Sequence, residues 1–120
     1  MGYLSNQASL TRSYPPNASY PLHGLVTYME SHDEQWMMYK NRAFGNASGD
    51  YNVRTLWTAL DRQKLVGAFF LLTPGPRMLW QFGEAGYGGG PGECLEPNNT
   101  CPPGTPGRVS NKPIRWDYVS

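Results

Sequence analysis

The stretch from Leu25 to Glu34 reads LVTYMESHDE, and it determines how the rest of the chain is interpreted. It begins as a short apolar and β-branched run, which is typical of a buried strand. It ends in a cluster of polar and ionisable side chains. Because α/β barrels carry their catalytic groups at the carboxyl ends of the strands, we predict a core strand over Leu25–Glu30 and a functional tip over Ser31–Glu34.

Two later segments complete a strand–helix–strand pattern. Apolar residues recur at helical spacing over Val53–Leu72 and predict a long helix. The second half of this helix, Leu65–Leu72, is apolar nearly all round, which predicts burial. Arg77–Phe82 is almost continuously apolar, as in a strand covered on both faces. Two strands joined through a helix are expected to be parallel, so Glu84 would follow the second strand at the end where the tip follows the first.

The tip also fits a purely structural interpretation. Ser31 and Glu34 have the spacing of a helix capping box, in which each side chain bonds the other residue's backbone N–H. Asp33 in a first turn would favour the positive end of that helix. The two interpretations are compatible, because a helix can begin directly at a catalytic tip. Gln35–Asn41 is the expected helical continuation, and Gly67 is expected to let the later helix press closely on the sheet.

Length and charge restrict the class of protein. The chain has 120 residues and a net charge of +1, without the basic stripe that a nucleic-acid partner requires. The longest apolar run, Leu65–Leu72, is too short to span a membrane. We expect a loop over residues 1–24 that leads into the first strand, a strand–helix–strand unit over 25–85, and a Gly/Pro-rich loop with a C-terminal extended segment over 86–120.

The chain has two cysteines, Cys94 and Cys101, and both lie in the Gly/Pro-rich loop. We predict a local disulfide between them, the alternative being two free thiols. A disulfide would favour an oxidising compartment, extracellular or periplasmic. A zinc site is not expected, because neither cysteine belongs to a Cys-x-x-Cys pair.

Three blocks of this sequence, in order, resemble the α-amylase family of glycoside hydrolases. Val26–Glu34 (VTYMESHDE) is similar to the family's strand-seven motif, an apolar strand that ends in His-Asp, with Ser31 where Asn is usual. Leu72–Glu84 (LTPGPRMLWQFGE) is similar to the strand-eight region, and Lys112–Tyr118 (KPIRWDY) to the stretch that follows it. The resemblance implies the last strands and helix of a (β/α)8 TIM barrel. A complete barrel needs about 250 residues, so the chain would be part of a larger enzyme.

The resemblance also implies roles for individual residues. Asp33 corresponds to the carboxylate that stabilises the transition state, and His32 to a residue that hydrogen-bonds the same sugar. Glu34, Glu84 and Trp80 are further candidates for substrate binding at the strand ends. The family's nucleophile and acid motifs are not found in this sequence, so the chain alone is expected to be inactive. No cofactor is expected in this segment, since the calcium common in the family is held by other parts of the enzyme.

The expected partner is an α-1,4-glucan such as starch or glycogen, hydrolysed with retention of configuration. A glucan branching or transfer enzyme of the same family is one alternative. A non-catalytic extracellular carbohydrate-binding module is another, and it would explain the aromatic content of 13% without any catalysis. Such a module is expected to consist mostly of short antiparallel strands, whereas this sequence predicts a long helix between two strands.

Overall fold

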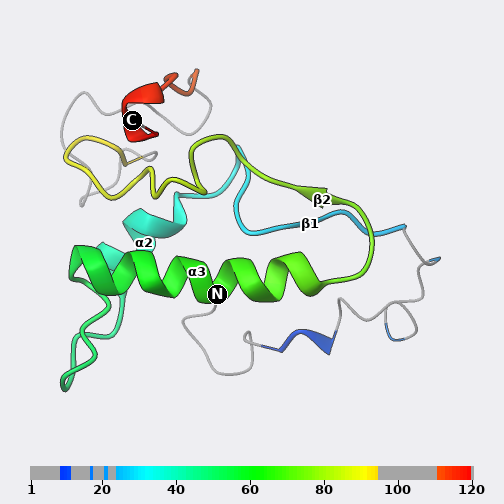
Figure 1. Cartoon of the computed structure of the whole chain (residues 1–120), viewed down its shortest axis with the longest axis horizontal. Helices are drawn as coiled ribbons and strands as arrows, with labels where there is room; N and C mark the ends of the chain where they lie inside the picture. The colour runs from blue at the N-terminus through cyan, green and yellow to red at the C-terminus, as the bar shows by residue number, and fades with distance from the viewer. Residues whose placement is uncertain (1–8, 12–16, 18–20, 22–23, 95–110, 120) are drawn as a thin grey trace.

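The computed structural model describes residues 9–11, 17, 21, 24–94 and 111–119. Its elements are strand β1 (Thr27–Tyr28), helix α2 (Met37–Phe44), helix α3 (Leu56–Leu72), strand β2 (Arg77–Met78) and a 3-10 helix (Trp116–Tyr118). The long helix α3 runs beside the two strands, and α2 packs against its N-terminal half (Figure 1). The described part of the chain is therefore a mixed α/β unit, as the pattern of strand, helix and strand predicts.

The two strands form a parallel sheet, in which Thr27 pairs with Arg77 and Tyr28 with Met78. The backbone N–H of Thr27 also donates to the carbonyl of Pro76 at 3.0 Å. The parallel direction confirms the expectation from the strand–helix–strand order. The sheet has two strands and is not closed, so the described residues form no barrel.

Both strands are shorter than predicted. The six-residue segments Leu25–Glu30 and Arg77–Phe82 contribute two paired residues each, because the chain turns away soon after the pairing. Phe82 already lies in a turn with φ 63°, a left-handed conformation that is uncommon outside glycine. Its ring is buried all the same, so the apolar character that predicted a strand belongs partly to a buried turn.

The hydrophobic core lies beyond the carboxyl ends of the strands. Trp36, Phe82 and Tyr87 form its buried centre, with Trp80 and Tyr118 packed against it. The rings of Trp36 and Tyr87 meet edge to face, with centroids 4.9 Å apart, which is a favourable aromatic geometry. The core thus fixes the segment after β2 against the start of α2, next to the predicted functional tip.

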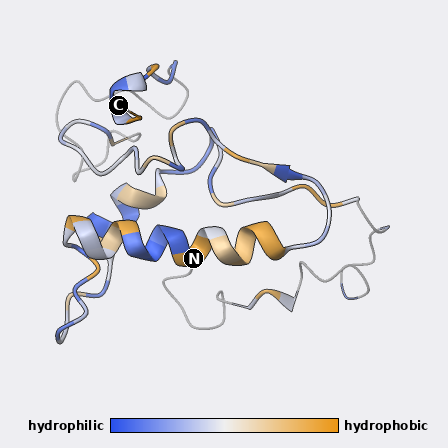
Figure 2. Cartoon of the chain, in the orientation of Figure 1, coloured by the Kyte–Doolittle hydropathy of each residue, from blue (hydrophilic) through white to orange (hydrophobic). Residues whose placement is uncertain are grey.

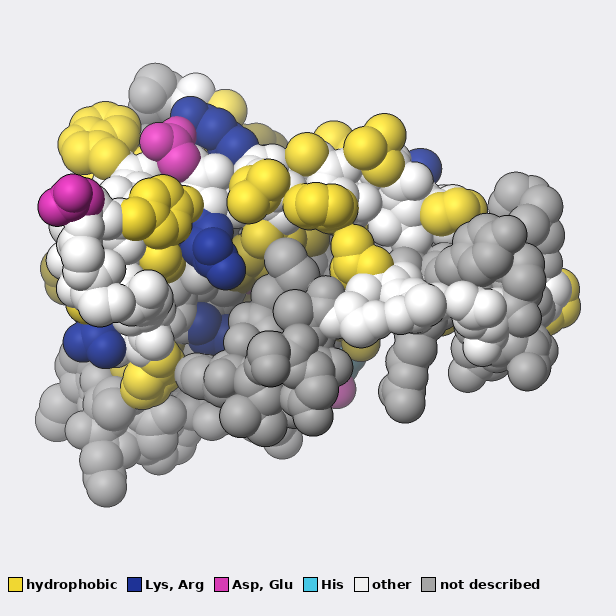
Figure 3. All heavy atoms as spheres, turned by 90° about the horizontal axis from the view of Figure 1, so that it is seen from below, with side chains coloured by type: hydrophobic (Ala, Val, Ile, Leu, Met, Phe, Trp, Pro, Cys, Tyr) yellow, Lys and Arg dark blue, Asp and Glu magenta, His cyan; other side chains and the backbone are white. Residues whose placement is uncertain are grey.

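The apolar half of α3 is largely uncovered, contrary to expectation. Val66 and Phe70 are buried, but four large apolar side chains in this half are exposed: Leu65, Phe69, Leu71 and Leu72. Figure 2 shows the hydrophobic colour concentrated in this half of the helix, and Figure 3 shows hydrophobic side chains gathered on the same side of the molecule. The prediction of burial is wrong for this chain, because two short strands cover only one side of the helix.

Gly67 also differs from expectation, because a Cβ at this position would meet no atom within 4 Å. The helix does not approach the sheet closely there, so none of the described residues requires a glycine at this position. Replacing Gly67 by Ala is expected to raise the free energy of unfolding by about 1 kcal/mol, because alanine loses less backbone entropy in a helix. Urea unfolding measures this change, and a destabilised Gly67→Ala chain would show that the space is occupied in solution.

Candidate functional site

The predicted tip lies directly after β1 and is accessible. The His32 imidazole Nε2 lies 3.4 Å from the Asp33 carboxylate Oδ2, and the two side chains are 67% and 63% exposed. An acid and an imidazole paired in this way present both groups to the same bound molecule. Their exposure means that a ligand can reach them without any opening of the fold.

The neighbouring Ser31 and Glu34 form a closed turn and do not begin a helix. The Ser31 hydroxyl donates to the Glu34 carboxylate and accepts the backbone N–H of Asp33 at 3.2 Å. Helix α2 begins only at Met37, so the predicted capping box is wrong as a helix start. The Ser31–Glu34 bond instead holds Glu34 in the turn, where its side chain is half-buried.

Trp80 follows β2, and its side chain lies beside the tip. Its ring centroid lies 6.0 Å from that of His32 and 6.4 Å from that of Trp36. The indole N–H of Trp80 is buried and has no hydrogen-bond partner in the described part of the chain. The structure therefore brings together three of the predicted site residues, His32, Asp33 and Trp80, from the segments that follow the two strands.

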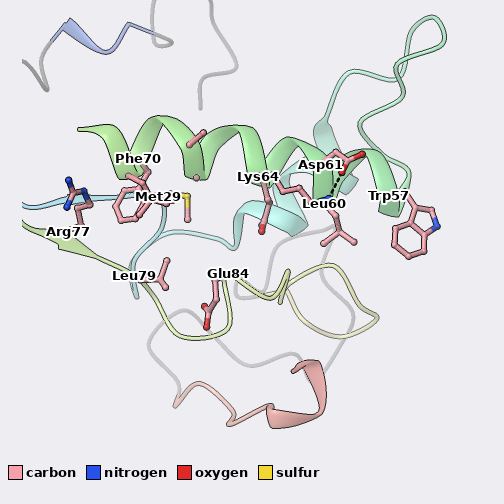
Figure 4. A pocket seen from close by; sticks show the side chains of 13 residues that line it. Met29, Trp57, Leu60, Asp61, Lys64, Phe70, Arg77, Leu79 and Glu84 are labelled. Atoms are coloured by element: carbon pink, nitrogen blue, oxygen red, sulfur yellow. Dashed lines mark hydrogen bonds and ion pairs between the residues drawn. The ribbon is translucent and has the colours of Figure 1, made fainter. Parts of the chain in front are cut away.

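Glu84 is placed differently from these three residues. It is exposed and lines a pocket of about 830 Å³ below α3, together with Met29, Leu79 and Phe70. Figure 4 shows this pocket between the helix and the segment that follows β2. The lining includes neither His32 nor Asp33, so Glu84 belongs to an apolar recess beside the tip.

The sequence pattern missed Glu30 as a candidate. Its side chain is 4% exposed, and its Oε2 accepts the backbone N–H of Met37 at 2.7 Å. This bond caps the first turn of α2 with a carboxylate, which favours the positive end of a helix. The signal in the sequence is an acidic residue at the end of an apolar strand, which we interpreted as the last strand residue.

The environment of Glu30 favours its neutral form. Burial raises the pKa of the Glu30 carboxyl to about 7, and Glu84 adds to this effect, whereas the Met37 N–H and Lys40 oppose it. The other carboxylate oxygen packs against Gly83, where a Cβ would overlap it. A side chain at position 83 would therefore displace the Glu30 carboxylate, which is a steric reason for glycine before Glu84 that is independent of any role of Glu84.

Glu93 is the second buried acid that the sequence pattern missed, and it organises the loop after the core. Its Oε2 accepts the backbone N–H groups of Gly88 and Gly90, at 2.9 and 2.8 Å. Its Oε1 accepts from Arg115 at 3.0 Å and from the Tyr118 hydroxyl at 2.6 Å. Burial, followed by this bond to Glu93, raises the pKa of Tyr118 to about 12. This carboxylate is fully satisfied, so it fastens the C-terminal segment to the loop.

The predicted disulfide lies at the edge of the described chain. Cys94 is disulfide-bonded and almost completely buried, and the predicted partner Cys101 lies outside the described residues. Within the described ranges, no group of three or more His, Cys, Asp and Glu side chains is placed to hold a metal ion. None of the described helices has the length and apolar character that crossing a bilayer requires.

No protein-family model matches the chain, and a search of curated proteins found no match either. The interpretation of the site therefore depends on the geometry described above and on the motifs quoted from the sequence.

Proposed function

We propose that the chain is part of an α-amylase-type glycoside hydrolase that acts on α-1,4-glucans such as starch or glycogen. The single observation that supports this most is the parallel pairing of β1 with β2, which places the exposed His32–Asp33 pair beside Trp80. Catalytic groups of α/β barrels lie at this end of the strands. The motifs that resemble the family are the segments that meet there.

The chemistry of the tip fits sugar binding. Glycoside hydrolysis passes through an oxocarbenium-like transition state, so a fixed carboxylate near the sugar lowers its energy. Asp33 is the carboxylate proposed for this role, with His32 as a hydrogen-bond donor to the same sugar ring. Trp80 supplies an aromatic face at the same place. Glu34 and Glu84 are proposed only as residues at the rim, because one is bonded to Ser31 and the other lines the neighbouring recess.

The surface of α3 is consistent with a place in a larger barrel. In such a barrel each strand has a neighbour on both sides, and the helices pack side by side around the outside. The exposed apolar residues Leu65, Phe69 and Leu72 would be covered by the missing strands and helices of that barrel. The nucleophile and the acid would come from the same missing part, so the chain alone is proposed to be inactive.

The rival interpretation as a carbohydrate-binding module has less support. It expects mainly short antiparallel strands, whereas α3 has 17 residues and the two strands are parallel. A branching or transfer enzyme of the same family would use the same tip. It differs from a hydrolase in that a second glucan, and not water, accepts the cleaved sugar chain.

The proposal is tested by comparing the chain with a longer polypeptide. The longer polypeptide joins the chain to the missing part of the barrel, which supplies the nucleophile and the acid. The longer polypeptide is expected to release reducing sugar from soluble starch, and proton NMR should show the α-anomer as the first product. The 120-residue chain should release none. A completed barrel that folds but leaves starch and glycogen unchanged would overturn the proposal, and transfer to a second glucan would favour the branching alternative.

A further inference from the structure

The carboxylate of Glu30 lies where three segments of the chain meet. Its own backbone lies two residues after the end of β1 and two residues before His32. Its Oε2 accepts the N–H of Met37 at the start of α2. Its Oε1 packs against Gly83, in the turn that follows Trp80. One buried side chain thus connects the segment that carries His32 to the segment that carries Trp80.

The contacts of the Glu30 carboxylate with Met37 and with Gly83 depend on the length of the glutamate side chain and on the absence of a side chain at Gly83. A Cβ on residue 83 would overlap the carboxylate, so the turn can approach Glu30 only because Gly83 is present. The bond to Met37 uses a backbone N–H that would otherwise lack a partner in the first turn of a helix. A shorter acidic side chain reaches less far from the β1 segment, so we do not expect it to keep both contacts.

We propose that Glu30 is a positioning residue, which holds the end of β1, the start of α2 and the turn after Trp80 together and so sets the placement of His32 against Trp80. Only one consequence rests on the proposed function, namely that His32 and Trp80 bind sugar when they are held in this way. The placement itself is a property of this chain.

Two charged groups, Lys40 and Glu84, influence whether the Glu30 carboxyl is neutral or ionised. Lys40 lies on α2 and favours the carboxylate, whereas Glu84 lies in the turn after β2 and favours the neutral acid. With burial as the largest influence, the group changes charge near neutral pH. A neutral acid and a carboxylate both accept the Met37 N–H, so the contact persists while its strength changes with pH.

The test compares Glu30→Gln, Glu30→Asp and Glu30→Ala in the full 120-residue chain, with Glu93→Gln as a control at the other buried acid. Proton NMR measures the cross-peak between the His32 and Trp80 rings, after assignment of His32 with a His32→Gln chain. Glutamine keeps the length and the acceptor oxygen, so the cross-peak is expected to persist in Glu30→Gln. It is expected to be lost in Glu30→Ala and weakened in Glu30→Asp. Glu93→Gln should lower stability and leave the cross-peak in place.

The outcomes separate positioning from general stabilisation. A cross-peak that survives in a folded Glu30→Ala chain would overturn the proposal, as would its equal loss in Glu93→Gln. If Glu30→Ala does not fold, the comparison of Glu30→Asp with Glu30→Gln decides, since positioning requires the aspartate to be worse than the glutamine. None of these signals needs a sugar, so a chain that fails to bind glucan leaves the test of Glu30 intact.

Discussion

Replacing Asp33 by Asn in a completed barrel is expected to lower turnover by about a thousandfold while the fold and the melting temperature stay nearly unchanged. Losing one preorganised group that stabilises transition-state charge typically costs a factor of about 10² to 10³ in turnover. Asparagine keeps the size and a hydrogen-bonding oxygen but removes the negative charge beside the developing oxocarbenium ion. Asp33 is 63% exposed, and its carboxylate lies 3.4 Å from the exposed His32 imidazole, so its charge contributes little to folding.

Asp61→Asn is the matched control for this substitution. Asp61 is 67% exposed and pairs with Lys64 on α3 at 2.8 Å, so Asp61→Asn removes the same charge from the helix instead of from the tip. Turnover of soluble starch is expected to be unchanged in the control. If Asp33→Asn retains most of its turnover, or if both variants lose it equally, the assignment of Asp33 as transition-state stabiliser is wrong.

The order and direction of the elements could be predicted from the sequence. The predicted helix Val53–Leu72 is found as Leu56–Leu72, and the two flanking strands pair in parallel as expected. These features depend on local periodicity and on the length of the connection, which are visible along the chain. The same reasoning placed Trp80 near the end of the second strand, and its ring lies beside that of His32. Glu84 was expected at the tip as well, but it lines the neighbouring recess instead.

The role of individual polar residues could not be predicted in the same way. Glu30 was interpreted as the last residue of a strand, but it is a buried acid that contacts Met37 and Gly83. Glu93 was interpreted as part of a loop, but it binds Arg115 and the backbone of that loop. For Glu30, the partner Gly83 lies in the turn at Phe82, whose left-handed conformation has no signal in the local sequence. For Glu93, the partner Arg115 lies 22 residues further along the chain.

The surface of α3 shows a different limit of sequence reasoning. An apolar helix predicts that something covers it, but it does not say whether the cover lies in the same stretch of chain. Here Phe69 and Leu72 are 48% and 82% exposed. The sequence pattern therefore predicts a covered helix, and the described residues supply only part of the cover.

The second large effect is a dependence of stability on pH that is carried by Glu30. Burial raises its pKa from an ordinary value of 4.5 to about 7, so between these values the folded chain holds a proton that the unfolded chain releases. Stability is therefore expected to be highest below about pH 4.5, as far as Glu30 is concerned. It falls as the pH rises, and the loss is complete above about pH 7. A shift of this size corresponds to about 3 kcal/mol.

Glu30→Gln isolates this contribution, because glutamine cannot ionise and keeps an acceptor for the Met37 N–H. The difference in unfolding free energy between the two chains is expected to favour the glutamine chain by about 3 kcal/mol at pH 8 and to be small at pH 4.5. Urea titrations at several pH values, followed by tryptophan fluorescence to which the buried Trp36 contributes, measure this difference. All other titrating groups are common to both chains and cancel. A difference that does not change with pH would show that the Glu30 carboxyl is hydrated, and that burial does not govern its charge.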